Sequence, residues 1–314
     1  MCGRTSCTLE PDELAKSCQY VNDRGENRKP QWHTSDCSKF MPSPNISPQS
    51  FTPVLVSACK VISEENKELM SNDESMLKMM KWGLIPSWHR GDPSSFGYKM
   101  NNARIESIME KKSFKGPLEK GRRCVVLAEG FYEWQVVKGS REKQPYFVYF
   151  KRDIKPCDNN NKPFEDDKSS KPLLTMAGIF DVWHSSEEGE PLYSYSVITL
   201  EAKAPFRNIH HRVPALLKDE DSVHQWLHSE EVDYKQALKL LSADDYLDWH
   251  PVSKAVNNSR YKELDCTKAI DLTLVDKMKN RSKITNWFEA SPKKRESTSG
   301  TNAEPAVKRE KLEQ

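Results

Sequence analysis

The chain has 314 residues, and its 48 Lys and Arg residues against 46 Asp and Glu residues leave a formal net charge of only +2. This balance excludes binding of nucleic acid through a positive field of the whole protein, so any such site must be a local cluster of cations. Hydrophobic residues make up 36%, which predicts that part of the length is not packed.

Apolar, aromatic and β-branched runs continue to about Val275 without a linker, which predicts one domain over residues 2–274. Strands are predicted at residues 54–62, 123–134, 144–150, 173–183 and 193–200. Helices are predicted after Pro11 and Asp12, before Phe114, and at 222–228 and 233–241. Because these elements lack βαβ regularity, we expect an α+β fold with a mainly antiparallel sheet and interspersed helices.

Two segments are predicted to lie outside the packed core. Residues 151–172 are polar and rich in Asn and Asp, which is typical of a long surface insertion between strands. Residues 275–314 are rich in Ser, Lys, Glu and Pro, so we expect a disordered basic tail. Its basic runs at 293–295 and 308–311 suggest nuclear import.

Membrane, metal and cofactor chemistry are not expected. The sequence has no long apolar run and no charged start followed by an apolar stretch. The eight cysteines are scattered, with no CxxC pair and no His at finger spacing, which indicates reduced thiols. We therefore expect no metal site and no cofactor, and nothing asks for more than a monomer.

The start MCGRTSC places Cys2 directly behind Met1. Removal of Met1 would leave an amine and a thiol on one residue, with reference pKa values of ~7.7–8.0 and ~8.5. The amine can condense with an aldehyde to an imine, and the thiolate can close on it to a five-membered thiazolidine. The same pair could attack a peptide carbonyl, and the plain alternative is that Cys2 is merely the second residue.

Two further stretches carry residues suited to DNA. In KWGLIPSWH, Trp82 fits a buried position, whereas Trp88 lies next to a polar stretch and is the better candidate to stack on a base. In NNARIES, an Asn can orient an aldehyde-derived oxygen or an amine, and Arg104 suits a phosphate. The alternative for NNARIES is a turn with an Asn cap before a helix.

Acid–base candidates come from GFYEWQ and NIHHRVP. Alternation along a strand puts Glu133 on the face opposite Trp134, and its aromatic neighbours should raise its pKa. A rim carboxylate paired with Lys or Arg is the alternative. His210 can shuttle the proton that imine formation requires. In an extended run His210 and His211 should point to opposite faces, which argues against a metal site.

The chain contains, in this order, the motifs MCGR, WGLIPSW, NNARIES, EGFYEW, VITLEA and NIHHRVP. Together they resemble the motifs of the SRAP (SOS response-associated peptidase) family over roughly residues 2–270. Each motif alone is weak, but the combination is specific. The resemblance implies that Met1 is removed and that Cys2 forms a thiazolidine crosslink with the ring-opened aldehyde of an abasic site in single-stranded DNA. The crosslink would protect replication forks, in nuclear chromatin, from strand cleavage and error-prone synthesis.

The resemblance also implies roles for individual residues. Asn102 would position the Cys2 amine or the sugar, Glu133 would shuttle protons to the opened sugar, and His210 would assist ring opening and the imine steps. The DNA contacts implied by the family motifs are Arg4, Arg104 and Arg212 on phosphates, Trp88 against a base beside the lesion, and Thr199 lining the pocket.

Other functions stay open at this point. Cys2 could serve a thiol peptidase with Glu133 and His210 as its acid–base pair, or the chain could be a non-catalytic reader of modified DNA bases. In the tail, Ile284, Trp287 and Phe288 have the spacing of a box that binds a sliding clamp (PCNA), although Arg281 replaces the usual Gln. A short amphipathic turn that packs on the domain is the alternative.

Overall fold

The computed structural model describes residues 2–22, 24–34, 36–62, 74–96, 100–137, 139–151, 173–185, 189–243 and 246–274. Contacts divide the chain into a unit of residues 1–270 and a unit of residues 271–314. The predicted tail motif and nearly all of the predicted insertion at 151–172 lie outside the described residues. None of the helices in the described ranges is long and apolar enough to cross a membrane.

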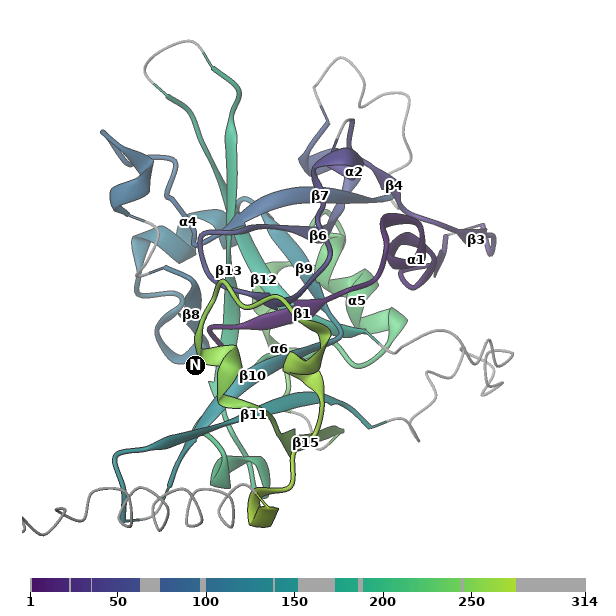
Figure 1. The fold of residues 1–314 in the computed structure, drawn as a ribbon. Coiled ribbons are helices and arrows are strands. Elements are labelled where there is room, and N and C mark those ends of the chain that lie inside the picture. The colour runs from purple at the N-terminus through teal and green to yellow at the C-terminus, as the bar shows by residue number, and fades with distance from the viewer. Residues whose placement is uncertain are drawn as a thin grey trace, which may run out of the picture. The chain divides into compact units, whose positions relative to one another are not determined.

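The larger sheet of the first unit closes on itself (Figure 1). Its strands are β4 (Gln31–Trp32), β6 (Phe51–Ser57), β7 (Ser75–Trp82), β8 (Asn102–Arg104), β9 (Arg123–Ala128), β12 (Leu174–Trp183), β13 (Leu192–Glu201) and β14 (Arg212–Pro214). The order β13-β12-β9-β6-β7 is antiparallel, and β7 returns to β13 as a parallel pair. Closure removes the exposed edges that an open sheet of this size would have.

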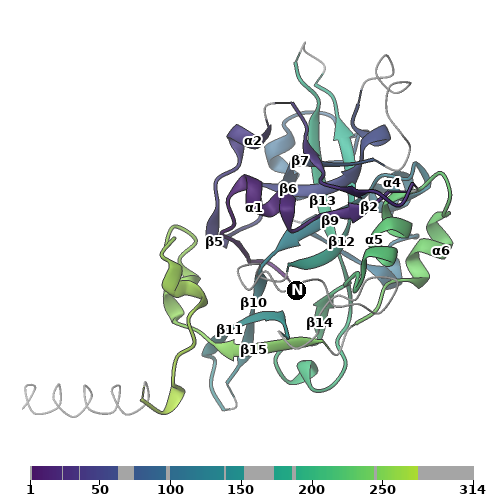
Figure 2. The same ribbon diagram turned by 90° about the vertical axis from the view of Figure 1, so that its right-hand side faces the viewer.

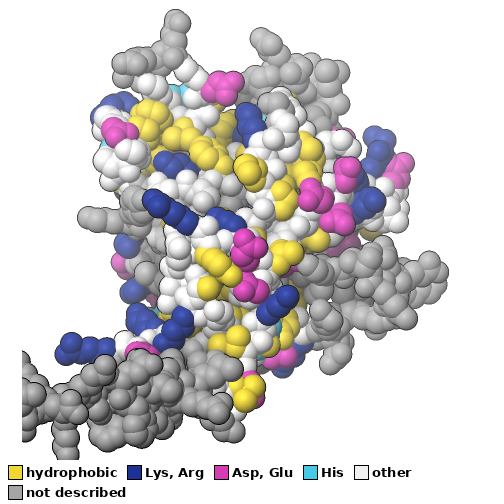
Figure 3. Space-filling view, in the orientation of Figure 1, with side chains coloured by type: hydrophobic (Ala, Val, Ile, Leu, Met, Phe, Trp, Pro, Cys, Tyr) yellow, Lys and Arg dark blue, Asp and Glu magenta, His cyan; other side chains and the backbone are white. Residues whose placement is uncertain are grey.

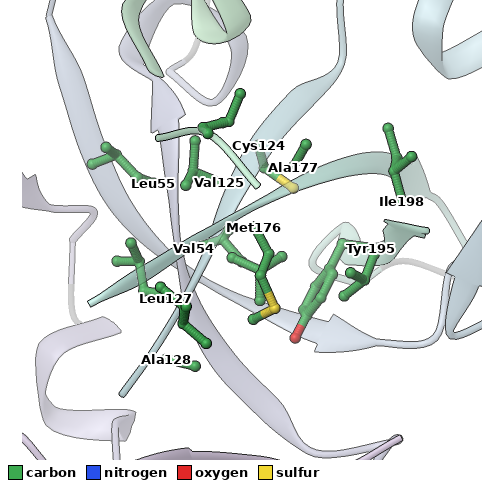
Figure 4. Close-up of a cluster of buried hydrophobic side chains, with 14 of the residues drawn as sticks. Val54, Leu55, Cys124, Val125, Leu127, Ala128, Met176, Ala177, Tyr195 and Ile198 are labelled. Carbon is green, nitrogen blue, oxygen red and sulfur yellow. The ribbon is translucent and has the colours of Figure 1, made fainter. Parts of the chain in front are cut away.

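The closed strands β13-β12-β9-β6-β7 form a ring. Close packing inside this ring depends on Gly178 in β12. A Cβ at this position would lie 2.9 Å from the Cys124 sulfur and 3.2 Å from the Ser196 carbonyl oxygen. Figure 4 shows the apolar side chains that fill this region, among them Val54, Met176 and Ile198. Burial of these side chains is the main term that stabilises the ring.

A second sheet carries the start of the chain. In the described ranges it comprises β15 (Leu247–Pro251), β11 (Lys143–Phe150), β10 (Gly130–Val136), β1 (Thr5–Cys7) and β5 (Ser43–Ile46), in that order and antiparallel. A separate small ribbon pairs β2 (Tyr20–Val21) with β3 (Asn27–Arg28). Figures 1 and 2 both place the N-terminal end beside β10.

Short helices lie between the strands. They are α1 (Pro11–Lys16), α2 (Asp36–Lys39), α4 (Lys112–Glu119), α5 (Glu220–Leu227) and α6 (Tyr234–Lys239). Pro11 occupies the first turn of α1, where its missing N–H costs nothing, and Asp219 caps α5 by accepting from Ser222. These local signals explain why helices begin at these points.

The predicted α+β class with a mainly antiparallel sheet is confirmed, and three element predictions are wrong in detail. The predicted strand at 54–62 ends at Ser57 and continues as a 3-10 turn. The helix expected before Phe114 instead begins at Lys112 and contains Phe114. The predicted strand at 123–134 is two strands of different sheets, because the chain changes sheets at Glu129, whose N–H donates to the Ser6 carbonyl.

Candidate active site

Cys2 lies where β1 approaches β10. Thr5 pairs with Phe131 in this register, and the Tyr132 N–H donates to the Arg4 carbonyl at 2.8 Å. Antiparallel pairing therefore carries the chain before Arg4 toward Glu133 on β10. The side chain of Cys2 is completely buried. Cys2 and Glu133, which are far apart in the sequence, are thus brought together by one strand pair.

Asn102 anchors the backbone of Cys2. Its Nδ2 donates to the Cys2 carbonyl at 2.7 Å, although 100 residues separate the two along the chain. Asn102 begins β8, which pairs in parallel with β13 at Val197. Its Oδ1 is buried and has no hydrogen-bond partner among the described residues. The amide therefore fixes Cys2 with one end and keeps an acceptor for an amine or hydroxyl at the other.

Glu133 supplies a buried carboxyl group beside Cys2. Only 2% of Glu133 is exposed, and this burial raises its pKa because the ionised form loses hydration. The alternative of an exposed rim carboxylate is therefore wrong. Burial also raises the pKa of the Cys2 thiol, and the negative charge of Glu133 raises it further. Both shifts disfavour the ionised forms of these two groups.

His210 completes the group of titratable side chains. Its Nδ1 lies 3.7 Å from Glu133 Oε1 and accepts from the Arg212 N–H at 3.1 Å. A neutral ring that accepts at Nδ1 carries its proton on Nε2. Burial lowers the pKa of His210, which favours this neutral form. The expectation that His210 and His211 point to opposite faces is wrong, because their ring centroids are 4.4 Å apart.

Arg212 is held by its own protein neighbours. The Arg212 side chain is 8% exposed and forms two hydrogen bonds with Glu106, at 2.8 and 3.0 Å. Its Nη2 also donates to the carbonyl oxygen of Thr199, which is fully buried on β13. Arg104 is the last residue of β8, where it lies opposite Thr199 of β13, and its side chain is exposed. The phosphate roles predicted for these arginines stay predictions.

Arg4 links β5 to the 3-10 turn at Lys254–Asn257. Its Nη1 donates to Asn45 Oδ1 at 2.7 Å and to the Val256 carbonyl at 2.8 Å. Its guanidinium lies 5.9 Å from the centre of the Trp134 ring. Burial lowers the pKa of Arg4. These contacts give Arg4 a structural role beside its predicted phosphate contact.

Trp88 is placed by a loop that the ring holds firmly. Trp88 is 43% exposed and meets the edge of Phe96, with ring centroids 5.9 Å apart. The neighbouring Ser87 N–H donates to Asp181 Oδ2 at 2.7 Å. Trp82, by contrast, is fully buried and stacked on Tyr195, which confirms the buried position predicted for it. An exposed indole on an anchored loop suits a contact with a nucleobase.

A surface hollow of about 490 Å³ lies near this site but does not belong to it. It is bordered by Trp134, Glu142, Lys143, Lys254 and Asn257. Successive side chains of β10 alternate between faces, so Trp134 and Glu133 face opposite ways. In the described ranges, no group of three or more His, Cys, Asp or Glu side chains could hold a metal ion.

Two residues of the site lacked a specific sequence signal. Glu106 is part of the quoted NNARIES motif, but its partner Arg212 lies 106 residues away. Asp181 lies in a strand predicted only for its apolar character, yet it anchors the loop of Trp88. Neither pairing can be read from local spacing, because both depend on how the strands of the ring are ordered.

The family comparison covers most of the chain that forms these two sheets. The model of the family "SOS response associated peptidase (SRAP)" matches residues 1–259, and the chain belongs to this family.

Several relatives named "Abasic site processing protein" are similar to the chain. HMCES of Pongo abelii is 42% identical over 95% of this chain and 85% of its own length, and HMCES of Xenopus tropicalis is 44% identical over 95% and 88%. YoqW of Bacillus subtilis is 33% identical over 83% of this chain and 96% of its own length.

Solved structures show the same fold at lower identity. A protein from Bacteroides thetaiotaomicron superposes with a TM-score of 0.63 at 22% identity and covers 86% of this chain and all of its own. A protein from Bordetella bronchiseptica gives a TM-score of 0.56 at 17% identity, over 80% of this chain and all of its own.

Proposed function

We propose that this protein senses and shields abasic sites in single-stranded DNA by forming a thiazolidine crosslink through Cys2 after Met1 is removed. The observation that carries the proposal is the group at the chain start, where Asn102 holds the Cys2 backbone and Glu133 acts electrostatically on Cys2 and lies 3.7 Å from His210. The relatives named as abasic site processing proteins support the same substrate.

The chemistry needs one aldehyde and the two functional groups of Cys2. The free amine of Cys2 adds to C1′ of the ring-opened sugar, and loss of one water gives an imine. The Cys2 sulfur then bonds to the imine carbon, the thiol proton leaves, and the ring nitrogen gains a proton. The sum is aldehyde plus aminothiol giving thiazolidine plus water, so the enzyme must move protons but needs no oxidant or cofactor.

Glu133 and His210 are placed to move those protons. A carboxyl group with a raised pKa can donate a proton to the leaving hydroxyl and then accept one from the thiol. His210 is held neutral by burial and by the Arg212 N–H, so it can accept a proton that Glu133 passes on or stabilise the carboxylate. Asn102 Oδ1, which is buried and available as an acceptor, fits the amine or the sugar hydroxyl.

Recognition of the strand is assigned to side chains around this group. We assign phosphate contacts to Arg4, Arg104 and Arg212 and a base contact to the exposed Trp88, with Thr199 in the pocket wall. A single strand is favoured because the sugar must enter a buried site that a stacked duplex would block. The location at replication forks in nuclear chromatin and the binding of a sliding clamp through Ile284, Trp287 and Phe288 are further parts of this proposal.

Covalent capture tests the proposal. The protein is incubated with a single-stranded oligonucleotide that carries one abasic site, and the products are separated under denaturing conditions. The wild-type protein should retain the oligonucleotide, and Cys2→Ala should lose capture while it still binds the strand noncovalently. Cys2→Ser should capture little better than Cys2→Ala, because an oxygen closes the analogous ring far less readily at neutral pH.

The same assay separates the other functions. Undiminished capture by Cys2→Ala would rule out the thiazolidine. A peptidase would turn over many substrate molecules, whereas a thiazolidine former keeps its product at one per protein. A reader of modified bases would bind the strand without any covalent product, and Cys2 would be dispensable.

A further inference from the structure

The contact between Glu106 and Arg212 resembles a contact with phosphate. Both oxygens of the carboxylate accept from the two terminal nitrogens of the guanidinium, at 2.8 and 3.0 Å. Arginine binds carboxylates and phosphates in this same paired geometry. Glu106 therefore occupies the surface of Arg212 that a phosphate would use.

The two partners differ in how firmly they are held. The Arg212 side chain is 8% exposed, and Nη2 is also fixed by the carbonyl and hydroxyl of Thr199, at 2.5 and 3.3 Å. The Glu106 side chain is 53% exposed and follows a strand end in a short 3-10 turn. The guanidinium is thus fixed by the ring of strands, whereas the carboxylate can swing into solvent.

If an incoming anion displaces the Glu106 side chain, the buried Arg212 guanidinium keeps a charged partner. Removing one partner of a buried charge pair is costly because the other charge stays desolvated. The Arg212 hydrogen bond lowers the pKa of Glu106, so the carboxylate is ionised at neutral pH. An incoming phosphate would exchange one ionised partner for another, and Arg212 would stay paired throughout.

We propose that Glu106 is a placeholder for a DNA phosphate: it holds Arg212 in the binding pose, and its displacement by the strand sets the affinity and salt dependence of binding. This inference rests on the proposed function, because it requires single-stranded DNA at Arg212. Glu106 is a positioning residue, since it touches Arg212 and none of the reacting atoms. Arg104 also acts electrostatically on the Glu106 carboxylate.

Noncovalent binding in a salt series tests the placeholder. All proteins carry Cys2→Ala, and the probe is a fluorescent single strand with a tetrahydrofuran abasic analogue, which has no aldehyde. Glu106→Gln should bind about three- to tenfold more tightly at low salt, because no ionised carboxylate competes for Arg212. The slope of log K against log salt should steepen by up to ~0.7, the value for one more phosphate contact on a single strand.

Glu201→Gln is the matched control. Glu201 is opposite Arg212 in the β13–β14 register, but its carboxylate pairs with Arg207 at 3.0 Å, and both of these side chains are exposed. The substitution removes the same charge close to the same place. Its affinity and salt slope should stay within twofold of the parent. An equal gain in Glu201→Gln would overturn the inference, because the effect would then be a general one of charge.

Two further variants decide the remaining outcomes. In an Arg212→Ala background, Glu106→Gln should give no gain, and a gain there would contradict the placeholder. If Glu106→Gln lowers the melting temperature, Glu106→Asp replaces it, and this shorter acid should bind more tightly than the parent. Unchanged or weaker binding by both Glu106 variants overturns the inference alone. Absence of binding by the parent protein would overturn the proposed function as well.

Discussion

Glu133 combines burial with the proton-transfer role that we propose for it. The sequence predicted a raised pKa from its aromatic neighbours in GFYEWQ, and the structure gives burial as the largest cause. The sequence pattern could not predict whether Glu133 faces the core or the rim, because aromatic residues occur on both faces of β10. The pairing of β10 with β1 decides this, since it brings Glu133 toward Cys2 and away from solvent.

Glu133→Gln should stabilise the protein at neutral pH while it slows crosslinking. The unfolded carboxyl titrates at ~4.3, and the folded one titrates higher because burial raises its pKa. Between these two values the folded state binds more protons, so the stability of the wild-type protein falls as pH rises. The melting temperature of Glu133→Gln should therefore exceed that of the wild type at pH 7, and the difference should vanish near pH 4. Crosslinking should slow by about 10²-fold or more.

Melting curves across pH check the stability half of this prediction. The control is Glu201→Gln, whose carboxylate is exposed and pairs with Arg207. It should show no such pH-dependent gain. A Glu133→Gln protein that is less stable than wild type at pH 7, or a gap that grows toward acid pH, would show that Glu133 is ionised and well paired.

Contacts between residues from distant parts of the sequence, such as Glu106 and Arg212, could not be predicted from the sequence. The motifs NNARIES and NIHHRVP each contain one partner of the Glu106–Arg212 contact, and both were singled out. The two motifs meet because β8 and β14 both pair with β13, β8 in parallel and β14 antiparallel. Strand order over such separations depends on the packing of the whole ring, which no local pattern encodes.

At the scale of elements, the change of sheet at Glu129 shapes the site. A single strand over 123–134 fits the local apolar pattern, and only tertiary packing shows that β9 and β10 belong to different sheets. Glu129 fixes the junction, since its carboxylate accepts from the Thr8 backbone and, at 2.6 Å, from the Thr8 hydroxyl. The strands predicted at 144–150, 173–183 and 193–200 are confirmed because each is long, apolar and bounded by polar residues.

Gly130→Ala should disrupt the start of β10. A Cβ at Gly130 would lie 2.3 Å from Phe147 Cζ and 2.6 Å from the Val148 carbonyl oxygen, and the backbone cannot yield easily. Overpacking of this kind costs about 1–3 kcal/mol. The free energy of unfolding should fall by that amount, and crosslinking should fall with it, because β10 carries Glu133.

Urea unfolding provides the measurement, with Gly189→Ala as its control. A Cβ at Gly189 would meet no atom within 4 Å, so this variant should stay within about 0.5 kcal/mol of wild type. Equal stability of the two variants would mean that Phe147 gives way freely and that β10 is not packed as tightly as the structure indicates.

Positive and negative charges are nearly balanced over the whole molecule. Acidic and basic side chains are interspersed on the face shown in Figure 3, in line with the net charge of +2. On this face the mixed charges match the balance that the composition predicts (Figure 3). In the proposed function, binding of a strand would depend on a few cations, of which Arg104 is exposed and Arg212 is already paired.

The domain limits also belong to this scale. The first unit ends at Ile270, close to the expected boundary at 274, and the family model matches residues 1–259. The tail motif with Trp287 and Phe288 lies outside the described residues, so clamp binding stays a proposal. Deleting the tail should leave crosslinking intact if residues 2–274 hold the whole site.

Intact mass spectrometry tests the central claim most directly. The purified protein is measured before and after incubation with a single-stranded oligonucleotide that carries one abasic site. We predict that the mass of Met1 is missing at the start, and that the product equals protein plus oligonucleotide minus one water, with the adduct on Cys2. A processed Cys2 that gains no mass, or an adduct on any other residue, would contradict the account.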